Sequence, residues 1–145
     1  LGRKPKLHCG RAATSQLSIH CIIESEEPTM SESKLRTQSM DFAVSIVNLV
    51  KNLKENRESI ISNQIGRSGT SIGANIREAQ YAHGKADFIA KLQIALKEAN
   101  ETGYWLELLY KTNYISDAEY KLLDSACTSI RVMLISSINT AKERQ

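Results

Sequence analysis

Hydrophobic side chains recur along most of the chain at intervals of three and four residues, which places them on one face of an α-helix. This pattern predicts four helices, with apolar positions recurring over 42–53, 61–79, 88–109 and 116–138. Only short polar segments separate them, and short connections place successive long helices antiparallel. We therefore predict an all-α fold, an up-down-up-down antiparallel four-helix bundle.

The third stretch has the clearest repeat, with steps of 4, 3, 4, 3, 4 and 3 residues. Such a heptad seam is typical of helices that pack along their length. Its members are Phe88, Leu92, Ala95, Ala99, Thr102, Leu106 and Leu109. The fourth helix begins with Ser116-Asp117-Ala118-Glu119, where serine and glutamate side chains can satisfy free backbone N–H groups in a capping box.

The second stretch contains a run of small residues that breaks an ordinary rule. Glycine, serine and threonine crowd 64–76, and each glycine inside a helix costs about 1 kcal/mol, so composition indicates a loop. The spacing of Ile65, Ile72 and Ile76 instead continues the helical stripe, and we favour the helix. A phosphate-binding loop is the functional alternative, but the glycine-lysine-serine/threonine ending of a Walker A motif is absent.

Both prolines, Pro5 and Pro28, precede the helical pattern, which indicates a structural boundary after them. We assign 1–36 to an N-terminal extension, irregular or dispensable, and 37–145 to the bundle domain. The chain starts with leucine, and we interpret residues 1–29 as lying upstream of the natural start or as otherwise dispensable.

Charge and cysteine content limit the function classes only weakly. The formal net charge is +3, from 19 basic and 16 acidic residues, which neither demands nor excludes an RNA partner. Three cysteines cannot form a closed set of disulfides, and nothing resembles a secretory signal. No apolar run approaches the roughly 20 residues of a membrane helix. We expect a cytoplasmic protein with reduced thiols and no membrane partner.

The small-residue run begins a series of motifs that resembles a known family, the bacterial four-helix bundle proteins also called 23S rRNA intervening sequence proteins. The matching residues are 64–67, Thr70-Ser71-Ile72-Gly73-Ala74-Asn75-Ile76, Glu78, Asp87-Phe88, Lys91-Leu92, Ile94-Ala95, Lys97-Glu98-Ala99, Tyr104-Trp105-Leu106, Ile130 and Met133-Leu134. The resemblance covers roughly 38–142, in order. Gly66, Gly69 and Ala79 depart from the family pattern, and Gly66 removes one cation from its motif.

The resemblance implies a four-helix bundle that assembles into a ring-shaped homopentamer. Some family members are encoded within intervening sequences of large-subunit ribosomal RNA genes. Similar proteins serve diversity-generating retroelements, where the pentamer binds a reverse transcriptase and nucleic acid. The resemblance does not distinguish between these roles.

Four polar residues step by 4, 4 and 3 along one strip of the second predicted helix: Arg67, Ser71, Asn75 and Glu78. We interpret them as a polar network at a helix or subunit contact, because buried polar groups need partners. Glu98 and Glu101 on the third helix are the acidic partners expected for Arg67. Tyr104 is expected to serve as an interface or core anchor.

A nucleic-acid interface is the sharper alternative for the same region. Arg67 and Arg77 would then face phosphates, since the guanidinium fork binds phosphates and carboxylates alike. Lys85 and Lys91 are the further cations that we assign to this interface, and a plain solvated surface is the other interpretation of the lysines.

The sequence offers little for catalysis, a metal or a cofactor. Histidine and cysteine, both zinc-ligand types, occur as two adjacent pairs in the extension, His8-Cys9 and His20-Cys21. Their spacing matches no common site. The helical part contains only His83, and Cys127 falls on an apolar stripe, as expected of an inert buried thiol. We expect no enzyme, metal or cofactor; a catalytic function would need a pocket where titratable groups converge.

Two functions follow from the sequence. The first is a non-enzymatic homo-oligomeric scaffold that associates with RNA. The alternative is a protein-interaction or assembly module with no direct nucleic-acid contact, for example a reverse-transcriptase accessory protein. Reversing the charge of Arg67 separates the two, because it breaks either the oligomer or only RNA binding.

Overall fold

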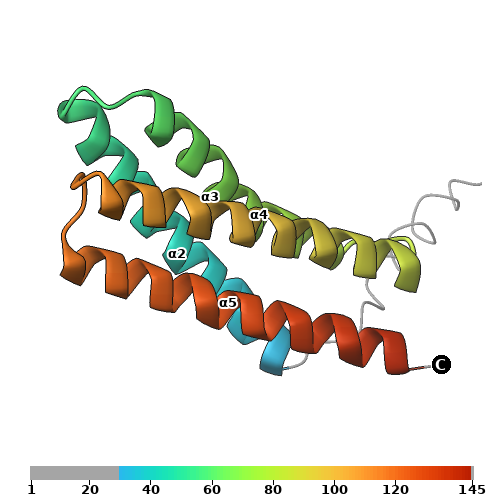
Figure 1. The fold of residues 1–145 in the computed structure, drawn as a ribbon. Coiled ribbons are helices and arrows are strands. Elements are labelled where there is room, and N and C mark those ends of the chain that lie inside the picture. The colour runs from blue at the N-terminus through green and yellow to red at the C-terminus, as the bar shows by residue number, and fades with distance from the viewer. Residues whose placement is uncertain (1–29, 145) are drawn as a thin grey trace, which may run out of the picture.

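The computed structural model describes residues 30–144, which form helices and no strand. The helices are α2 (Met30–Glu55), α3 (Ile60–Ala79), α4 (Lys85–Lys111) and α5 (Asp117–Glu143). They lie side by side and run alternately in opposite directions (Figure 1). Each packs against two neighbours, and the contact of α2 with α5 closes the bundle. The predicted all-α antiparallel four-helix bundle is confirmed.

The first helix begins at Met30, seven residues before residue 37, where we predicted the start of the bundle domain. Residues 30–36 are mostly polar and contain too few apolar positions for the helical repeat to show. Leu35 is nevertheless buried in the core, so these residues belong to the bundle. The two His-Cys pairs lie in residues 1–29, outside the described part of the chain.

The run of small residues is helical throughout α3, as its spacing predicted. Its isoleucines Ile65, Ile72 and Ile76 are all buried. A Cβ atom at Gly69 would lie 2.9 Å from both Cγ atoms of Ile46 on α2, closer than side-chain carbons approach. The glycine therefore allows α2 and α3 to pack more closely than a larger residue would permit.

The turn between α2 and α3 contains a cap that sequence analysis missed. Glu58 is buried, and its Oε1 and Oε2 accept the backbone N–H groups of Ile61 at 2.8 Å and Ser62 at 2.7 Å. A carboxylate here also faces the positive end of the helix dipole. The usual cap residues are Ser, Thr, Asp and Asn, so a glutamate gives little signal in the sequence.

The third and fourth predicted helices agree closely with α4 and α5. Six of the seven seam residues of α4 are buried, from Leu92 to Leu109, and Phe88 packs against the core from its edge. The capping box is present, since Glu119 N–H donates to Ser116 Oγ and Glu119 Oε2 accepts the Ser116 N–H. None of the described helices has the length and continuous apolar sequence needed to cross a bilayer.

Candidate functional site

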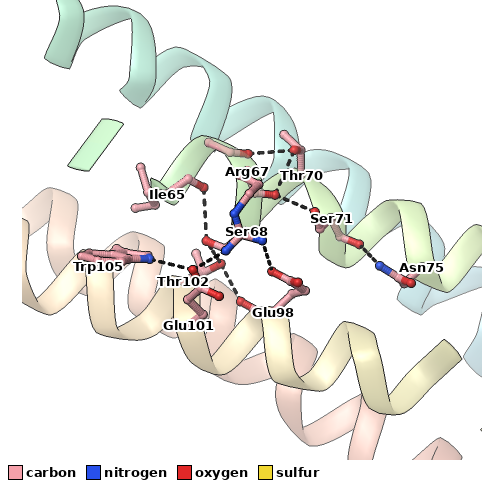
Figure 2. Close-up of polar contacts among 11 residues, drawn as sticks. Ile65, Arg67, Ser68, Thr70, Ser71, Asn75, Glu98, Glu101, Thr102 and Trp105 are labelled. Carbon is pink, nitrogen blue, oxygen red and sulfur yellow. Dashed lines mark hydrogen bonds and ion pairs between the residues drawn. The ribbon is translucent and has the colours of Figure 1, made fainter. Parts of the chain in front are cut away.

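An ion-pair cluster lies across α3 and α4 on the outer surface of the bundle. Arg67 on α3 reaches two carboxylates on α4 (Figure 2). Its Nη1 is 3.4 Å from Glu98 Oε2, and its Nη2 pairs with Glu101 Oε1. The structure thus brings Arg67 to both acidic residues that we expected as its partners.

Glu101 also connects the cluster to two aromatic rings. Trp105 Nε1 donates to Glu101 Oε1 at 3.2 Å, and the ring of Tyr104 meets that of Trp105 edge to face, with centroids 4.8 Å apart. The hydrogen bond from Arg67, followed by that from Trp105, holds the pKa of Glu101 below its ordinary value. The bond to Glu101 likewise raises the pKa of Arg67. The cluster therefore remains charged at neutral pH.

A pair of buried hydroxyl groups lies beneath this cluster, between the same two helices. Thr102 Oγ1 is 2.9 Å from Ser68 Oγ and donates to the Glu98 carbonyl oxygen at 2.8 Å. The sequence places Thr102 on the seam of α4 and Ser68 on the stripe of α3, but it did not indicate that the two hydroxyls would pair. A polar residue in the buried stripe of each helix was the available signal, because buried hydroxyls need partners.

The predicted polar strip of α3 is only partly joined to α4. Glu78 Oε2 pairs with Lys91 Nζ at 2.7 Å, so Arg67 and Glu78 cross between the helices. Ser71 Oγ instead donates to the Arg67 carbonyl oxygen at 2.7 Å, and Asn75 Nδ2 to the Ser71 carbonyl oxygen at 2.9 Å. These two side chains bond within their own helix, and the single network expected from the sequence is divided.

The four cations assigned to nucleic acid do not form one cluster. Arg67 and Lys91 are in ion pairs, and the hydrogen bond with Glu78 raises the pKa of Lys91. Lys85 Nζ donates to the carbonyl oxygens of Lys142, at 3.4 Å, and Arg144, at the end of α5. Arg77 is exposed and forms no ion pair with any other described residue.

The family assignment follows from comparison with known proteins. Residues 31–136 match the profile of the family described as 23S rRNA-intervening sequence protein. The chain belongs to this family. A similar solved structure is a protein of unknown function from the S23 ribosomal protein family of Bacteroides thetaiotaomicron, with 55% sequence identity and a TM-score of 0.75. The match covers 76% of this chain and 99% of that one. No functionally curated protein matches.

Two departures from the pattern of the intervening sequence proteins face α2. A Cβ atom at Gly66 would lie 3.2 Å from Val50 Cγ2, and Gly69 is closer still to Ile46. At the first of these positions the close approach to Val50 contributes to the packing of α3 against α2.

A small hollow opens between the helices at the end of the bundle where α2 and α4 begin. It is lined by Leu35, Ile76, Gln80, Phe88, Leu92 and Ser137. None of these side chains titrates, so the hollow lacks the converging groups that a catalytic hypothesis requires.

Two other side chains of chemical interest in the helical part are Cys127 and His83. Cys127 is buried, with Sγ 3.3 Å from the Ala99 carbonyl oxygen, and burial raises the pKa of this thiol to about 11. His83 is exposed. Within residues 30–144, no three His, Cys, Asp or Glu side chains are grouped so as to hold a metal ion.

Proposed function

We propose that this intervening sequence protein is a non-enzymatic, homo-oligomeric scaffold that associates with RNA. The observation that carries the proposal is that α2, α4 and α5 expose large apolar side chains on faces turned away from the core. These are Met40, Val44, Val47, Ile94, Tyr104, Leu122, Val132 and Ile135. Exposed apolar residues that share one face of a helix, such as Met40, Val44 and Val47 on α2, are typical of protein interaction sites.

The ion-pair cluster includes Glu98 and Glu101, on the same helix as Ile94 and Tyr104, and it supports the assembly role. Arginine, tryptophan and tyrosine are enriched at the centres of protein interfaces, and Arg67, Trp105 and Tyr104 lie together here. A closed homo-oligomer, the pentamer of our sequence-based expectation, would cover such a surface.

The association with RNA rests on the family description and on the positive formal charge of the chain, +3. Two exposed cations lie where α3 ends and α4 begins. Arg77 and Lys85 are exposed there, and Lys85 contacts the end of α5, which supplies Lys142 and Arg144. We propose this basic end of the bundle, defined by these four residues, as the phosphate contact.

An interaction module without RNA contact is the second candidate. It is favoured by one observation: Arg67 and Lys91, two of the four cations assigned to phosphate, are already paired with carboxylates. Charge reversal by Arg67→Glu would then dissociate the oligomer. Under the RNA proposal the same variant also weakens the oligomer, so the two candidates are separated at the basic end, where Arg77→Glu with Lys85→Glu weakens RNA binding only if that end contacts phosphates.

Light scattering on the full chain tests assembly, with a single species of about five chains expected. A monomeric mass at all accessible concentrations would contradict the scaffold proposal.

Titration with a structured RNA at low and physiological salt tests the proposed association with RNA. We expect the logarithm of the binding constant to fall linearly with the logarithm of salt concentration. Arg77→Glu with Lys85→Glu should weaken binding about tenfold or more and reduce the salt slope by roughly one for each lost phosphate contact. Lys121→Glu is the matched control, because Lys121 lies at the opposite end and pairs with Asp117. Equal affinity of both variants would refute the basic end as the contact.

A further inference from the structure

Helix α2 has a second apolar stripe on the side away from the core. Five residues step by 4, 4, 3 and 4, which aligns them along one strip: Arg36, Met40, Val44, Val47 and Lys51. The three apolar members are 42%, 54% and 42% exposed. We call these five residues the α2 strip. It has a cation at each end and no acidic member.

Helix α4 carries a strip of matching size and opposite charge. Its members step by 4, 3, 4 and 3 and are Ile94, Glu98, Glu101, Trp105 and Leu108. Ile94 is 43% exposed, and Trp105 and Leu108 are half-buried. We call these five residues the α4 strip. Its two carboxylates share the single guanidinium of Arg67, and the charge of Lys97 also helps to lower the pKa of Glu101.

We propose that the α2 strip of one copy docks on the α4 strip of a second copy. This inference rests on the proposed homo-oligomer and names the two surfaces that form it. The strips match in length, since Arg36 to Lys51 spans about 22 Å and Ile94 to Leu108 about 21 Å at the rise of an α-helix. They also complement each other in charge, with only cations on one and only carboxylates on the other.

The spacing along the two strips allows charged groups to face charged groups and apolar side chains to face apolar ones. When Lys51 lies over Glu98 and Glu101, Val47 is one helical turn away. Ile94 and Trp105 lie about one turn to either side of the two carboxylates on α4. Val47 therefore meets an apolar partner whichever way the two helices run. The ammonium group of Lys51 between the two carboxylates adds an ion-pair partner from the second copy.

The two strips lie on different helices, so the contact is heterologous. Each copy offers one α2 strip and one α4 strip, and successive copies join head to tail until the ring closes. This distinguishes the inference from a two-fold dimer in which one surface meets itself.

Two single variants, each blocking one strip, test this arrangement. Val44→Glu places a carboxylate in the α2 strip, and Ile94→Glu places one in the α4 strip. Each variant alone should associate roughly 100-fold more weakly than the wild type, because a buried carboxylate would lack a partner. A 1:1 mixture should form a heterodimer, since each variant keeps the strip that the other lacks. Analytical ultracentrifugation measures all of these masses.

Ile60→Glu is the matched control, because Ile60 is 78% exposed at the start of α3 and belongs to neither strip. It should leave the oligomer of the wild type unchanged. Lys51→Glu is a second, milder variant that removes no apolar contact and should weaken association about tenfold. Circular dichroism checks that each variant keeps its helices, and Lys51→Glu provides the test should Val44→Glu unfold.

The outcomes separate this inference from the function on which it rests. A monomeric wild type refutes the scaffold itself. An oligomeric wild type whose mass survives Val44→Glu or Ile94→Glu refutes the two strips and leaves the scaffold standing. A mixture of the two variants that stays monomeric overturns the head-to-tail arrangement.

Discussion

The two sides of α3 are joined to their neighbours by different kinds of contact. Toward α2, Gly69 lies so close to Ile46 that a Cβ atom would be 2.9 Å from its Cγ atoms, so this side depends on shape. Toward α4, the hydroxyls of Ser68 and Thr102 are 2.9 Å apart beneath the ion pairs of Arg67, so that side depends on polar partners. One helix can therefore be specified by sterics on one side and by hydrogen bonding on the other.

The largest expected effect comes from filling the space at Gly69. Gly69→Val adds a Cβ and two methyl groups against Ile46, where even the Cβ is too close. Overpacking of this kind typically costs about 1–3 kcal/mol, and β-branched residues are also poor helix formers. We expect the free energy of unfolding in urea to fall by about 3 kcal/mol.

Gly73→Ala is the control on the same helix. Its Cβ would lie 3.5 Å from Ser39 O and Oγ, an ordinary contact. Because alanine is favoured over glycine in a helix by up to about 1 kcal/mol, we expect unchanged or slightly higher stability. Equal stability of the Gly69 and Gly73 variants would show that the α2 contact does not depend on shape.

A smaller effect is expected from the buried hydroxyl pair. Thr102→Val keeps the volume of the side chain but leaves Ser68 Oγ without its partner on α4. An unsatisfied buried hydroxyl costs about 1–3 kcal/mol, and we expect a loss near the lower end because Ser68 also bonds within its helix, to the Ile65 carbonyl at 3.5 Å. Urea unfolding measures the loss.

The double variant Ser68→Ala/Thr102→Val sharpens this result. Removing both hydroxyls leaves no orphaned group, so part of the stability should return. Additive losses in the double-mutant cycle would mean that the two hydroxyls do not act as a pair.

The smallest expected effect concerns the ion pairs and depends on pH. The pKa of Glu101 is lowered in the folded state, chiefly by Arg67, so its contribution is present above the ordinary value of 4.5 and is lost as pH falls through the lowered value. Because Arg67 is about half exposed, solvent screening limits the contribution to roughly 1 kcal/mol or less.

Glu101→Gln isolates this contribution. The wild type should be slightly more stable than the variant in urea at neutral pH, and the difference should shrink below about pH 4.5 and in high salt. Gly69→Val, compared under the same conditions, should retain its full deficit. A pH-independent difference for Glu101→Gln would argue against the ion pairs.

Much of the site was predictable because helical periodicity orders residues along one strip. The spacing put Arg67 and Glu78 on one face of α3, and the acidic residues Glu98 and Glu101 on α4 were the evident partners. Ser71 and Asn75 lie on the same strip, but within this chain their side chains bond to carbonyl groups four residues earlier. Short polar side chains in helices can form such local hydrogen bonds to the backbone, and the spacing of residues does not show which of them do so.

Two features were not predicted from the sequence: the Glu58 cap and the start of α2 at Met30. The Glu58 cap depends on a backbone turn at Arg57, which has a φ of 61°, and a glutamate rarely marks such a turn. The start of α2 at Met30 depends on Leu35 reaching the core, which one apolar residue among polar neighbours does not reveal.

By itself, the sequence determined the number of helices, their buried faces and their alternating directions, because these follow from periodicity and from short connections between successive elements. The tertiary structure decided which neighbour each face of α3 meets and how closely. It also decided which cations are already paired and which apolar side chains remain on the outside. These outcomes depend on distances between residues far apart in the chain. A linear pattern of hydrophobic and polar positions does not give the distance between side chains on neighbouring helices.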